Sequence, residues 1–394
     1  MTDVVVVINS GSSSLKFALY PCDANRPEPL VRGKVTGIGR NPELSVVMEG
    51  EAIEPTEPLD SIPVEATHEW LIAQLLERLT GRYTNYHPVA VGHRVVHGGR
   101  EFDAPIIIDS SVRKKLEQFI PFAPSHQPHN LSAIDAITRV ASELPQVACF
   151  DTSFHRTQPK MAQLFALPRR FSDQGIIRYG FHGLSYEYIA SVLPQHLGEK
   201  AKGRVLVAHL GNGASMCAMR DSKSVATSMG FTALDGLMMG RRSGAIDPGV
   251  ILHLIQDHDM TADEVQHLLY RESGLFGVSG ISNNMQVLLD SGEPQAKEAV
   301  ELFCYRAVNE IGSLAAAMEG LDAVVFTAGI GENAAEVRRQ ICARLSWLSI
   351  EFDQGANQRN ATFISSSNSK IDVLVVPTDE EAIIAQHTRA LILE

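Results

Sequence analysis

The sequence has few cysteines, and their spacing does not indicate disulfide bonds. There are five in 394 residues, Cys22, Cys149, Cys217, Cys304 and Cys342, an odd number set far apart. They form no Cys-x-x-Cys pair and no metal-type Cys/His spacing, which argues against a disulfide-stapled secreted scaffold and a cysteine metal site. We therefore expect a reducing environment and a cytoplasmic protein.

Long apolar runs and an excess of positive charge are also missing. No stretch approaches the ~20 apolar residues that a membrane-spanning helix needs. The first apolar run, Val4–Ile8, is too short for a signal peptide and follows no basic residue. The 34 Lys and Arg are outnumbered by 46 Asp and Glu, which gives a net charge of −12. This balance argues against nucleic acid or an anionic membrane as a partner, so any cations that bind an anionic substrate must be local and few.

The remaining composition is that of a globular protein with a core. Hydrophobic residues make up 44% and charged residues 20% of the chain, which excludes a disordered or collagenous protein. The length predicts two or three domains. Helix-like stretches, among them Ala66–Leu79 and Ala299–Met318, alternate with short β-branched runs, and this order favours an α/β fold with largely parallel strands. The runs are Val4–Ile8, Val89–Val96, Val147–Phe150, Val205–Leu210, Val324–Thr327 and Val373–Val376.

Two segments about 200 residues apart have the same pattern. Val4–Tyr20 consists of an apolar run, a small-residue turn and an alternating run, and Val205–Met219 repeats this order. The repeat suggests two related domains, each with a strand–turn–strand unit.

Three segments rich in small residues are candidate phosphate-binding loops, because small residues let backbone N–H groups approach a phosphate. Asn9–Lys16 lacks the Gly-Lys-Ser/Thr order of a Walker A loop, and its alternation favours a β-hairpin. His209–Ser215 contains Gly-Asn-Gly, with an amide that can donate to a phosphoryl oxygen. Ala328–Asn333 is a loop between a strand and a helix predicted over Ala334–Leu345, at an N-terminus that favours anions. Each alone is compatible with an ordinary turn; together they favour nucleotide binding.

Two arginines are candidate anion clamps. Arg94 lies at the end of an apolar strand before glycines, and Arg242 lies in a Gly/Ser-rich loop. Together they could hold a transferring phosphoryl group, although an arginine–carboxylate pair that holds loops together would give the same pattern.

Other polar residues lie at apparent ends of elements. Asp151, His126 and His182 are candidates of this kind, and a structural role is open for each. Thr378 and Glu381 have the spacing of a capping box, which predicts a structural role for Glu381. Glu380 would point elsewhere and could bind Mg²⁺ directly or through water.

Taken together, these segments resemble the acetate/propionate/butyrate kinase family, from Val4 to about Ala385. The resemblance implies an α/β protein of two duplicated actin-like, ribonuclease-H-like ATPase domains with a cleft between them. The N-terminal domain is expected over residues 1–152 plus 383–394, and the C-terminal, nucleotide-binding domain over 153–382. It also implies a homodimer, Mg²⁺ (or Mn²⁺), and transfer of a phosphoryl group from ATP to acetate or another short carboxylate, giving ADP and an acyl phosphate.

The resemblance also assigns roles to residues. The catalytic group is Asp151, Arg94, Arg242, His182 and His126. The metal site is Asn9 and Glu380, and the phosphate loop is Lys16, Ser12 and Ser14. Val96, Phe181, Ser125 and Ala233 line the acyl pocket. The nucleotide contacts are His209, Leu210, Gly211, Asn212, Gly213, Asn284, Met285, Gln286, Gly329, Ile330, Gly331, Glu332 and Asn333.

The chain departs from the family pattern at four of these positions. Ser125 and Ala233 replace Leu and Pro, which predicts a roomier acyl pocket. Asn284 and Gln286 replace Asp and Arg, and this predicts either weaker recognition of the nucleoside or neutral amides that change nothing. A kinase with a hydroxyl acceptor, which would need Asp151 as its base, and a non-catalytic nucleotide-gated protein of the same fold remain the alternatives.

Overall fold

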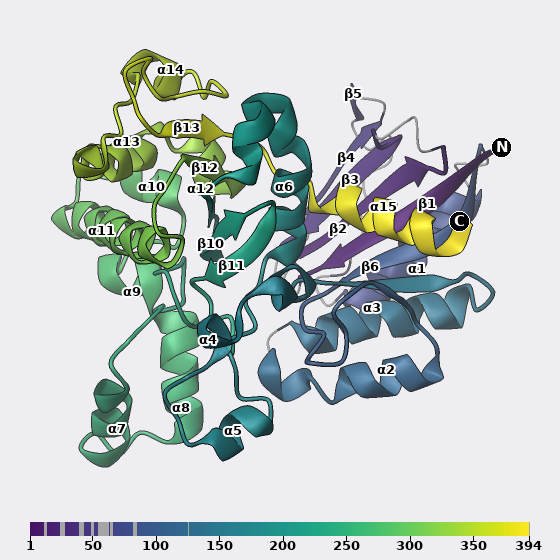
Figure 1. Ribbon diagram of the computed structural model, residues 1–394. Coiled ribbons are helices and arrows are strands. Elements are labelled where there is room, and N and C mark those ends of the chain that lie inside the picture. Colours follow the sequence, from purple (N-terminus) through teal and green to yellow (C-terminus); the bar gives the residue numbers. More distant parts are fainter. Residues whose placement is uncertain are drawn as a thin grey trace. The chain divides into compact units, whose positions relative to one another are not determined.

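The computed structural model (Figure 1) describes residues 1–11, 14–23, 28–38, 43–48, 51–53, 63, 66–81, 85–124 and 126–393. The chain divides into two compact units: unit 1 is Met1–Ser153 with Asp379–Glu394, and unit 2 is Phe154–Thr378. The sequence predicts the return to the first domain at residue 383. In the structure the return comes at Asp379, because a helix begins at Glu380 and packs on unit 1 from its first turn.

Unit 1 is built on an eight-stranded sheet in the order β5-β4-β3-β2-β1-β6-β8-β7. Its strands are β1 (Thr2–Ser10), β2 (Ser14–Pro21), β3 (Val31–Thr36), β4 (Glu43–Met48), β5 (Glu51–Ile53), β6 (Tyr86–Val95), β7 (Ile106–Ile107) and β8 (Gln146–Phe150). Its helices are α1 (His68–Gly81), α2 (Ser110–Glu117), α3 (Gln127–Val140) and α15 (Glu380–Leu393).

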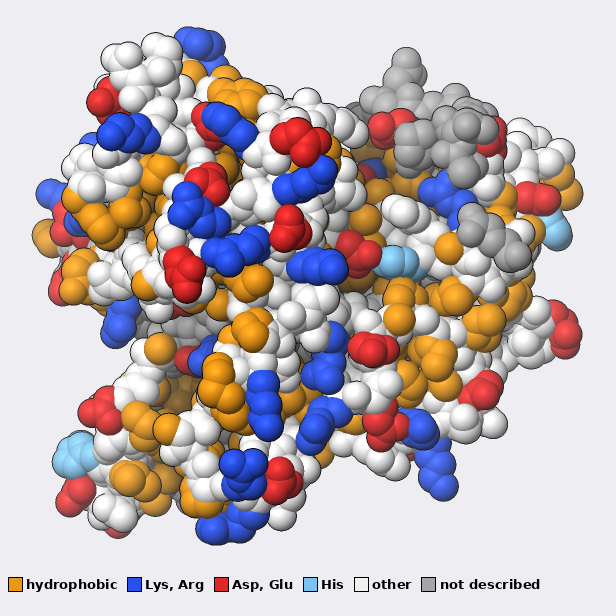
Figure 2. Space-filling model, viewed as in Figure 1, with side chains coloured by type: hydrophobic (Ala, Val, Ile, Leu, Met, Phe, Trp, Pro, Cys, Tyr) orange, Lys and Arg blue, Asp and Glu red, His pale blue; other side chains and the backbone are white. Residues whose placement is uncertain are grey.

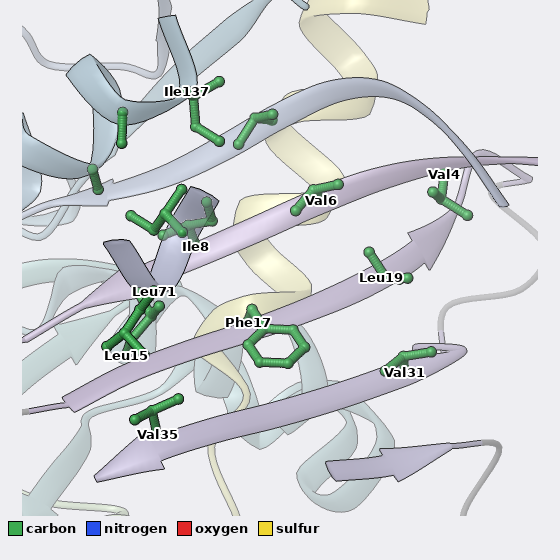
Figure 3. Close-up of a cluster of buried hydrophobic side chains, with 14 of the residues drawn as sticks. Val4, Val6, Ile8, Leu15, Phe17, Leu19, Val31, Val35, Leu71 and Ile137 are labelled. Atoms are coloured by element: carbon green, nitrogen blue, oxygen red, sulfur yellow. The ribbon is translucent and has the colours of Figure 1, made fainter. Parts of the chain in front are cut away.

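The alternation of the strands decides which helix covers which face of this sheet. Val4, Val6 and Ile8 of β1 pack with β2, β3, α1 and α3 in one apolar cluster (Figure 3). The intervening residues of β1 therefore point to the opposite face, and α15 contacts β1 and β6. Gly92 of β6 permits this approach, because a Cβ there would lie 2.3 Å from Thr388 Oγ1.

Unit 2 is built on a five-stranded sheet in the order β11-β10-β9-β12-β13. Its strands are β9 (Val205–Leu210), β10 (Ala214–Arg220), β11 (Lys223–Thr227), β12 (Ala323–Thr327) and β13 (Asp372–Val375). Its helices are α4 (Lys160–Gln163), α5 (Arg169–Asp173), α6 (Gly183–Leu197), α7 (Pro248–Gln256), α8 (Ala262–His267), α9 (Gly274–Ser279), α10 (Met285–Asp290), α11 (Pro294–Ala317), α12 (Ala328–Asn333), α13 (Ala335–Ala343) and α14 (Gln354–Gln358). Short 3-10 turns occur at Ile120–Phe122, Ser153–Thr157, Gly198–Lys202 and Ser346–Leu348, with a π-helical turn at Leu268–Glu272.

The two sheets share a five-strand pattern. In unit 1 an antiparallel hairpin, β1–β2, is extended by antiparallel β3 on one side and by parallel β6 and β8 on the other. In unit 2 the hairpin β9–β10 is extended in the same way by β11, β12 and β13. Both predicted hairpins are confirmed, and the repeat seen in the sequence corresponds to a repeat of topology.

Charge is not uniform over the surface of this acidic chain. Figure 2 shows Lys and Arg side chains gathered over the segment that contains α4 and α5 of unit 2. That segment includes Arg156, Lys160, Arg169 and Arg170, with Met161 and Leu167 exposed between them. This part of the surface is therefore basic, although the chain as a whole has a net charge of −12.

Candidate active site

In unit 1, parallel strands bring four of the predicted residues together at one edge of the sheet. Asn9 is near the end of β1, Arg94 near the end of β6, and Asp151 follows β8 directly. Since the three strands are parallel neighbours, their carboxyl ends meet. Asn9 alternates with the core residue Ile8 and so faces α15, as Arg94 does two residues after Gly92. Glu380 completes the group from the first turn of α15.

Arg94 is the centre of this group. Its Nε donates to Asp151 Oδ1 at 2.9 Å, and its Nη2 donates to Asp151 Oδ2 at 2.6 Å, so the pair is bidentate. Nη1 donates to Asn9 Oδ1 at 3.2 Å, and Glu380 Oε2 lies 4.0 Å from Nε. Burial opposes the charge of the guanidinium, but Asp151 and Glu380 outweigh it and raise the pKa of Arg94. The arginine therefore stays charged although it is largely buried, beside an Asp151 side chain that is 1% exposed.

Asn9 connects the arginine to the acidic first turn of α15. Its Nδ2 donates to Glu380 Oε2 at 3.2 Å and to Glu381 Oε1 at 3.3 Å. Lys16, opposite Asn9 in the hairpin register, brings its Nζ to 3.8 Å from Glu381 Oε1. Amide and carboxylate oxygens are ligands that suit Mg²⁺. In the part of the chain that the structure describes, no three His, Cys, Asp or Glu side chains group as metal ligands. Asn9 and Glu380 therefore fit an ion whose other ligands come from phosphates and water.

The expected capping box at α15 is wrong. Ala382 N donates to Asp379 Oδ1 at 3.0 Å, so Asp379 caps the helix. The hydroxyl of Thr378 donates instead to Ser185 Oγ in unit 2 at 2.9 Å. Glu381 is consequently available to Asn9 and Lys16 rather than to the helix backbone.

The start of α3 fixes the loop after β6. Val96 N donates to Asn130 Oδ1 at 3.0 Å, and Asn130 Nδ2 donates to Ser10 O at 2.9 Å. Gln127 Oε1 accepts from His97 N at 3.2 Å. Sequence reasoning missed Gln127 and Asn130; their one signal was that buried polar residues share the apolar face of α3 with Leu131 and Ile134. His126 precedes α3 and is half-buried, and Val96 is buried.

In unit 2, two of the predicted histidines stack on each other. The rings of His182 and His209 have centroids 4.2 Å apart at an interplanar angle of 14°. His209 lies on β9, two residues after Val207, which packs against α6; Ser215 on β10 shares this face with Cys217. His182 is the residue before α6 and has a left-handed backbone (φ 59°). Alternation and the helix start therefore bring both rings to the same place.

Arg242 lies beside this pair. A Cβ at Gly213 would lie 2.9 Å from Arg242 Nη2 and 3.3 Å from His182 Nε2, so both groups border the same glycine. Arg242 Nη1 donates to Ala233 O at 2.5 Å. The turn Gly211–Gly213 is closed by a bond from Gly211 N to Gly213 O at 3.1 Å. The predicted cation and the predicted Gly-Asn-Gly loop therefore meet in one unit.

Asn212 at the tip of that turn is held by residues from two other loops. Gly240 N donates to Asn212 O at 3.0 Å, and a Cβ at Gly240 would lie 2.0 Å from Asn212 Oδ1. Asn283 Nδ2 donates to Asn212 Oδ1 at 3.0 Å. Asn283 is a contact that the sequence did not indicate.

The segment Ala328–Asn333 is a helix, α12, and not the predicted loop. Ala328 takes a left-handed conformation (φ 63°), so the chain turns from β12 into the helix within one residue. A Cβ at Gly331 would lie 3.4 Å from the carbonyl carbon of Phe326, so this glycine sits close against the strand. A second helix, α13, follows in place of the single predicted helix over residues 334–345. Gly329, Ile330, Glu332 and Asn333 are therefore helical, and Glu332 Oε1 accepts from Thr378 N at 3.2 Å.

Asn284 and Gln286 have local partners. Asn284 is the N-cap of α10, and its side chain accepts from Gln286 N at 2.9 Å. Gln286 Nε2 donates to both carboxylate oxygens of Asp290, at 2.9 and 3.0 Å. Met285 between them is buried.

Of the expected acyl-pocket residues, Val96 and Phe181 are buried and Ala233 is half-buried; Ser125 lies outside the described residues. Of the phosphate loop, Ser12 also lies outside them, and Ser14 closes the β1–β2 turn by accepting from Gly11 N at 2.8 Å.

Comparison with known proteins gives a consistent result. The sequence profile described as the acetokinase family matches residues 4–386. An acetate kinase of Rhodopseudomonas palustris (strain ATCC BAA-98 / CGA009) is 50% identical over 393 residues, with 98% of both chains covered. An acetate kinase of Nitrobacter hamburgensis is 47% identical over 400 residues, covering 100% of this chain and 97% of that one.

Solved structures agree with the sequence relatives. A propionate kinase from Francisella tularensis superposes with a TM-score of 0.90 at 36% identity, covering 98% of this chain and 99% of its own. An acetate kinase of Porphyromonas gingivalis superposes with a TM-score of 0.86 at 36% identity, with both chains fully covered. These neighbours have the duplicated actin-like ATPase fold, in agreement with the repeated topology of units 1 and 2. The chain belongs to the acetokinase family of ATP-dependent kinases.

Proposed function

We propose that this protein transfers the γ-phosphoryl group of Mg-ATP to the carboxylate of acetate, giving acetyl phosphate and ADP, and that it catalyses the reverse reaction. One observation supports the proposal most directly: the guanidinium of Arg94 is held charged, in a fixed orientation, by Asp151, Asn9 and Glu380. A carboxylate acceptor is already an anion near neutral pH, because its pKa is near ~4. The reaction therefore needs cations that offset repulsion between anions more than it needs a base.

The pairing of Arg94 assigns a role to Asp151. Both carboxylate oxygens of Asp151 accept hydrogen bonds from the guanidinium. In the proposal Asp151 orients Arg94 and does not remove a proton from the acceptor. Arg94 binds the carboxylate, and Arg242 stabilises the charge of the phosphoryl group in transfer. His182 donates a hydrogen bond to a phosphoryl oxygen, and His126 is a further phosphoryl-site residue.

Nucleotide binding is proposed for the Gly-Asn-Gly turn and for two segments that lie at helices. His209–Gly213 and α12, with Asn284–Gln286, contact the nucleotide, and Lys16, Ser12 and Ser14 contact its phosphates. Asn9 and Glu380 hold Mg²⁺, which supplies positive charge to the phosphates when bound. The two side chains are in direct contact, with Asn9 Nδ2 donating to Glu380 Oε2 at 3.2 Å, which supports the assignment.

The test is a trapping assay. Enzyme, ATP, Mg²⁺ and acetate are incubated with hydroxylamine, which converts an acyl phosphate to a hydroxamate. We expect hydroxamate that depends on ATP and acetate. Absence of hydroxamate with acetate, propionate and butyrate alike would refute the proposal, and phosphorylation of an alcohol instead would favour the hydroxyl-acceptor alternative.

Propionate is the second candidate acceptor. The neighbour with a TM-score of 0.90 is named a propionate kinase, and Ser125 and Ala233 remove apolar bulk from the proposed acyl pocket. One methylene in a pocket is worth about 1–3 kcal/mol of discrimination. The ratio of kcat/KM for acetate to that for propionate should rise in a Ser125→Leu/Ala233→Pro variant. An unchanged ratio would mean that these positions do not shape the pocket.

We also propose a homodimer. Helix α7 has no buried residue, and Val250, Leu252 and Ile255 on it are 40–55% exposed, beside exposed Ile246. Exposed apolar side chains concentrated on one helix are typical of an interaction site, and a second copy of the chain would cover them. Light scattering should give twice the 43.0 kDa chain mass, and Leu252→Lys should give monomers. A monomeric parent would refute this part.

A cytoplasmic location completes the proposal. All five cysteines are reduced thiols, and four of them are buried. In the described part of the chain, no helix is long and apolar enough to cross a membrane.

A further inference from the structure

Each imidazole of the stacked pair is hydrogen-bonded through Nδ1 to a serine. His182 Nδ1 lies 2.8 Å from Ser215 Oγ, and His209 Nδ1 lies 2.8 Å from Ser185 Oγ. Each serine has a second hydroxyl partner. Ser215 Oγ is bonded to the hydroxyl of Tyr186, and Ser185 Oγ accepts from Thr378 Oγ1 at 2.9 Å. Two hydroxyl chains therefore end on the two rings. His209, Ser215, Ser185 and Tyr186 are buried, and His182 is 9% exposed.

The direction of the first chain follows from counting protons. A serine hydroxyl has one proton to donate, and here it has two partners, Tyr186 and His182. If Tyr186 donates to Ser215 and Ser215 donates to His182 Nδ1, every proton in the chain has an acceptor. If the chain ran the other way, the Tyr186 proton would have no acceptor among the described residues. If Ser215 accepted from both neighbours, its own proton would have none. Leaving such a buried donor unpaired is unfavourable, because the hydroxyl loses its hydrogen bond to water and gains none in the protein.

Burial acts in the same sense. It raises the pKa of Tyr186 well above its usual value, so the phenol keeps the proton that it donates. His182 Nδ1 then accepts, and the proton of the neutral ring is on Nε2. That nitrogen lies on the side of Gly213, beside Arg242 Nη2. A neutral Nε2–H is a donor, and it adds no second positive charge to a ring stacked on another imidazole.

We infer that Ser215 and Tyr186 are positioning residues for His182, and that their hydroxyl chain keeps the imidazole proton on Nε2, where it can donate to an oxygen of the transferring phosphoryl group. The Thr378–Ser185 chain has the same arrangement on His209. The inference rests on the proposed function only for the identity of the oxygen that accepts. The state of the ring can be measured without turnover.

The test compares two variants with a matched control. Tyr186→Phe removes one oxygen and keeps the ring that packs in the core, and Ser215→Ala removes the middle hydroxyl. Ser224→Ala is the control, because Ser224 Oγ is bonded to His155 Nδ1 at 2.9 Å in another buried Ser–His pair of the same unit. All three variants lose a buried hydroxyl. The side-chain partners of Ser224 Oγ are His155, Gln158 and Cys217, and not the stacked rings of His182 and His209.

Two readouts are used on each full-length protein. The first is the tautomer of His182, from long-range ¹H–¹⁵N spectra of protein labelled at histidine, assigned by the signals that His182→Gln lacks. The second is steady-state kinetics with ATP and acetate. We expect the parent and Ser224→Ala to show the Nε2–H form, and Tyr186→Phe and Ser215→Ala to show a mixture. We expect kcat to fall about ten- to a hundredfold in both, the size typical for removal of a group that orients a metal-binding histidine, with KM within about twofold.

An Nε2–H signal that is unchanged in both variants would overturn the inference, and so would a loss of kcat that Ser224→Ala shares. If Ser215→Ala does not fold, Tyr186→Phe decides alone. A parent that forms no hydroxamate but shows the Nε2–H form would refute the proposed function and leave the positioning role standing.

Discussion

Two buried arginines, one in each unit, are held in opposite ways. Arg94 in unit 1 is paired with carboxylates, and Asp151 and Glu380 raise its pKa against the effect of burial. Arg338 in unit 2 is fully buried, and the oxygens that it contacts are neutral: the carbonyls of Gly331, Glu332 and Asn357 and the side chains of Asn357 and Asn360, at 2.5–2.9 Å. Burial lowers the pKa of Arg338. Among the described residues, no carboxylate contributes to this shift.

Under the proposed function, this difference separates a cation that takes part in the reaction from one that stabilises the fold. The partners of Arg338 are carbonyl and amide groups at the end of α12, in α14 and at Asn360. This arginine therefore holds together the backbone around the segment proposed to contact the nucleotide. The partners of Arg94 are the carboxylates of Asp151 and Glu380 and the amide of Asn9, which lie at the carboxyl ends of parallel strands and in the first turn of α15. Substitution of Arg94 should therefore affect the reaction, and substitution of Arg338 should affect the stability of unit 2.

The largest expected effect is on turnover. Arg94→Ala should lower kcat by 10²-fold or more, a loss typical of a group that stabilises charge in the transition state, and Arg242→Ala should do the same. Arg94→Lys is the sharper variant, because it keeps a positive charge beside Asp151 but has no bidentate fork. Its kcat should stay well below that of the parent while its urea midpoint stays close. A loss confined to KM would demote both arginines to ground-state binding.

The next effect is on stability. Arg338→Met leaves the carbonyls of Gly331 and Glu332 without their donor, at about 1–3 kcal/mol for each unpaired group. The free energy of unfolding measured in urea should fall by a few kcal/mol, while kcat per folded molecule changes little below the new transition. A variant as stable as the parent would show that the segment does not need this arginine.

A third effect compares one buried histidine from each unit. Burial lowers the pKa of His93 in unit 1 and of His155 in unit 2 from 6.5 to about 4. Below pH 6.5 these two histidines bind protons in the unfolded chain but stay neutral in the folded protein. The free energy of unfolding therefore falls as the pH drops from 6.5 toward 4. Each histidine should lower the free energy of unfolding by about 2 kcal/mol between pH 7.5 and pH 5. In His93→Gln and His155→Gln the loss over this interval should be smaller by that amount; an identical pH dependence in parent and variants would contradict the assignment.

The smallest effect is expected on the preference for ATP over GTP. Because Asn284 caps α10 and Gln286 pairs with Asp290, we expect the neutral-amide interpretation to hold. Asn284→Asp keeps a capping acceptor, so the Asn284→Asp/Gln286→Arg variant should fold like the parent. The ratio of kcat/KM for ATP to that for GTP should change by less than about threefold. A rise of tenfold or more, which is ~1.4 kcal/mol, would favour a role in nucleoside recognition.

The sequence predicted the strands and both hairpins well because their signals are local. Val205–Leu210 was located to the residue, and the alternation after Ser14 was sufficient to exclude a Walker A helix. Arg94 and Asp151 were both predicted, but their pairing was not, because it depends on β6 and β8 being neighbours 57 residues apart. Ser215, Tyr186 and Arg338 gave no signal, since a lone serine on a strand or an arginine on a helix looks like a surface residue. The helical start at Ala328 was missed because few alanines have positive φ.

A double-mutant cycle on Arg94 and Asp151 tests the central claim most directly. If Asp151 acts by orienting Arg94, then Asp151→Asn should lower the kcat for acetate, and the double variant Asp151→Asn/Arg94→Ala should be no slower than Arg94→Ala alone. If Asp151 instead takes a proton from the acceptor, the two losses should multiply. Non-additive losses, with hydroxamate still formed by the parent, are the result that the account predicts; multiplied losses would contradict it.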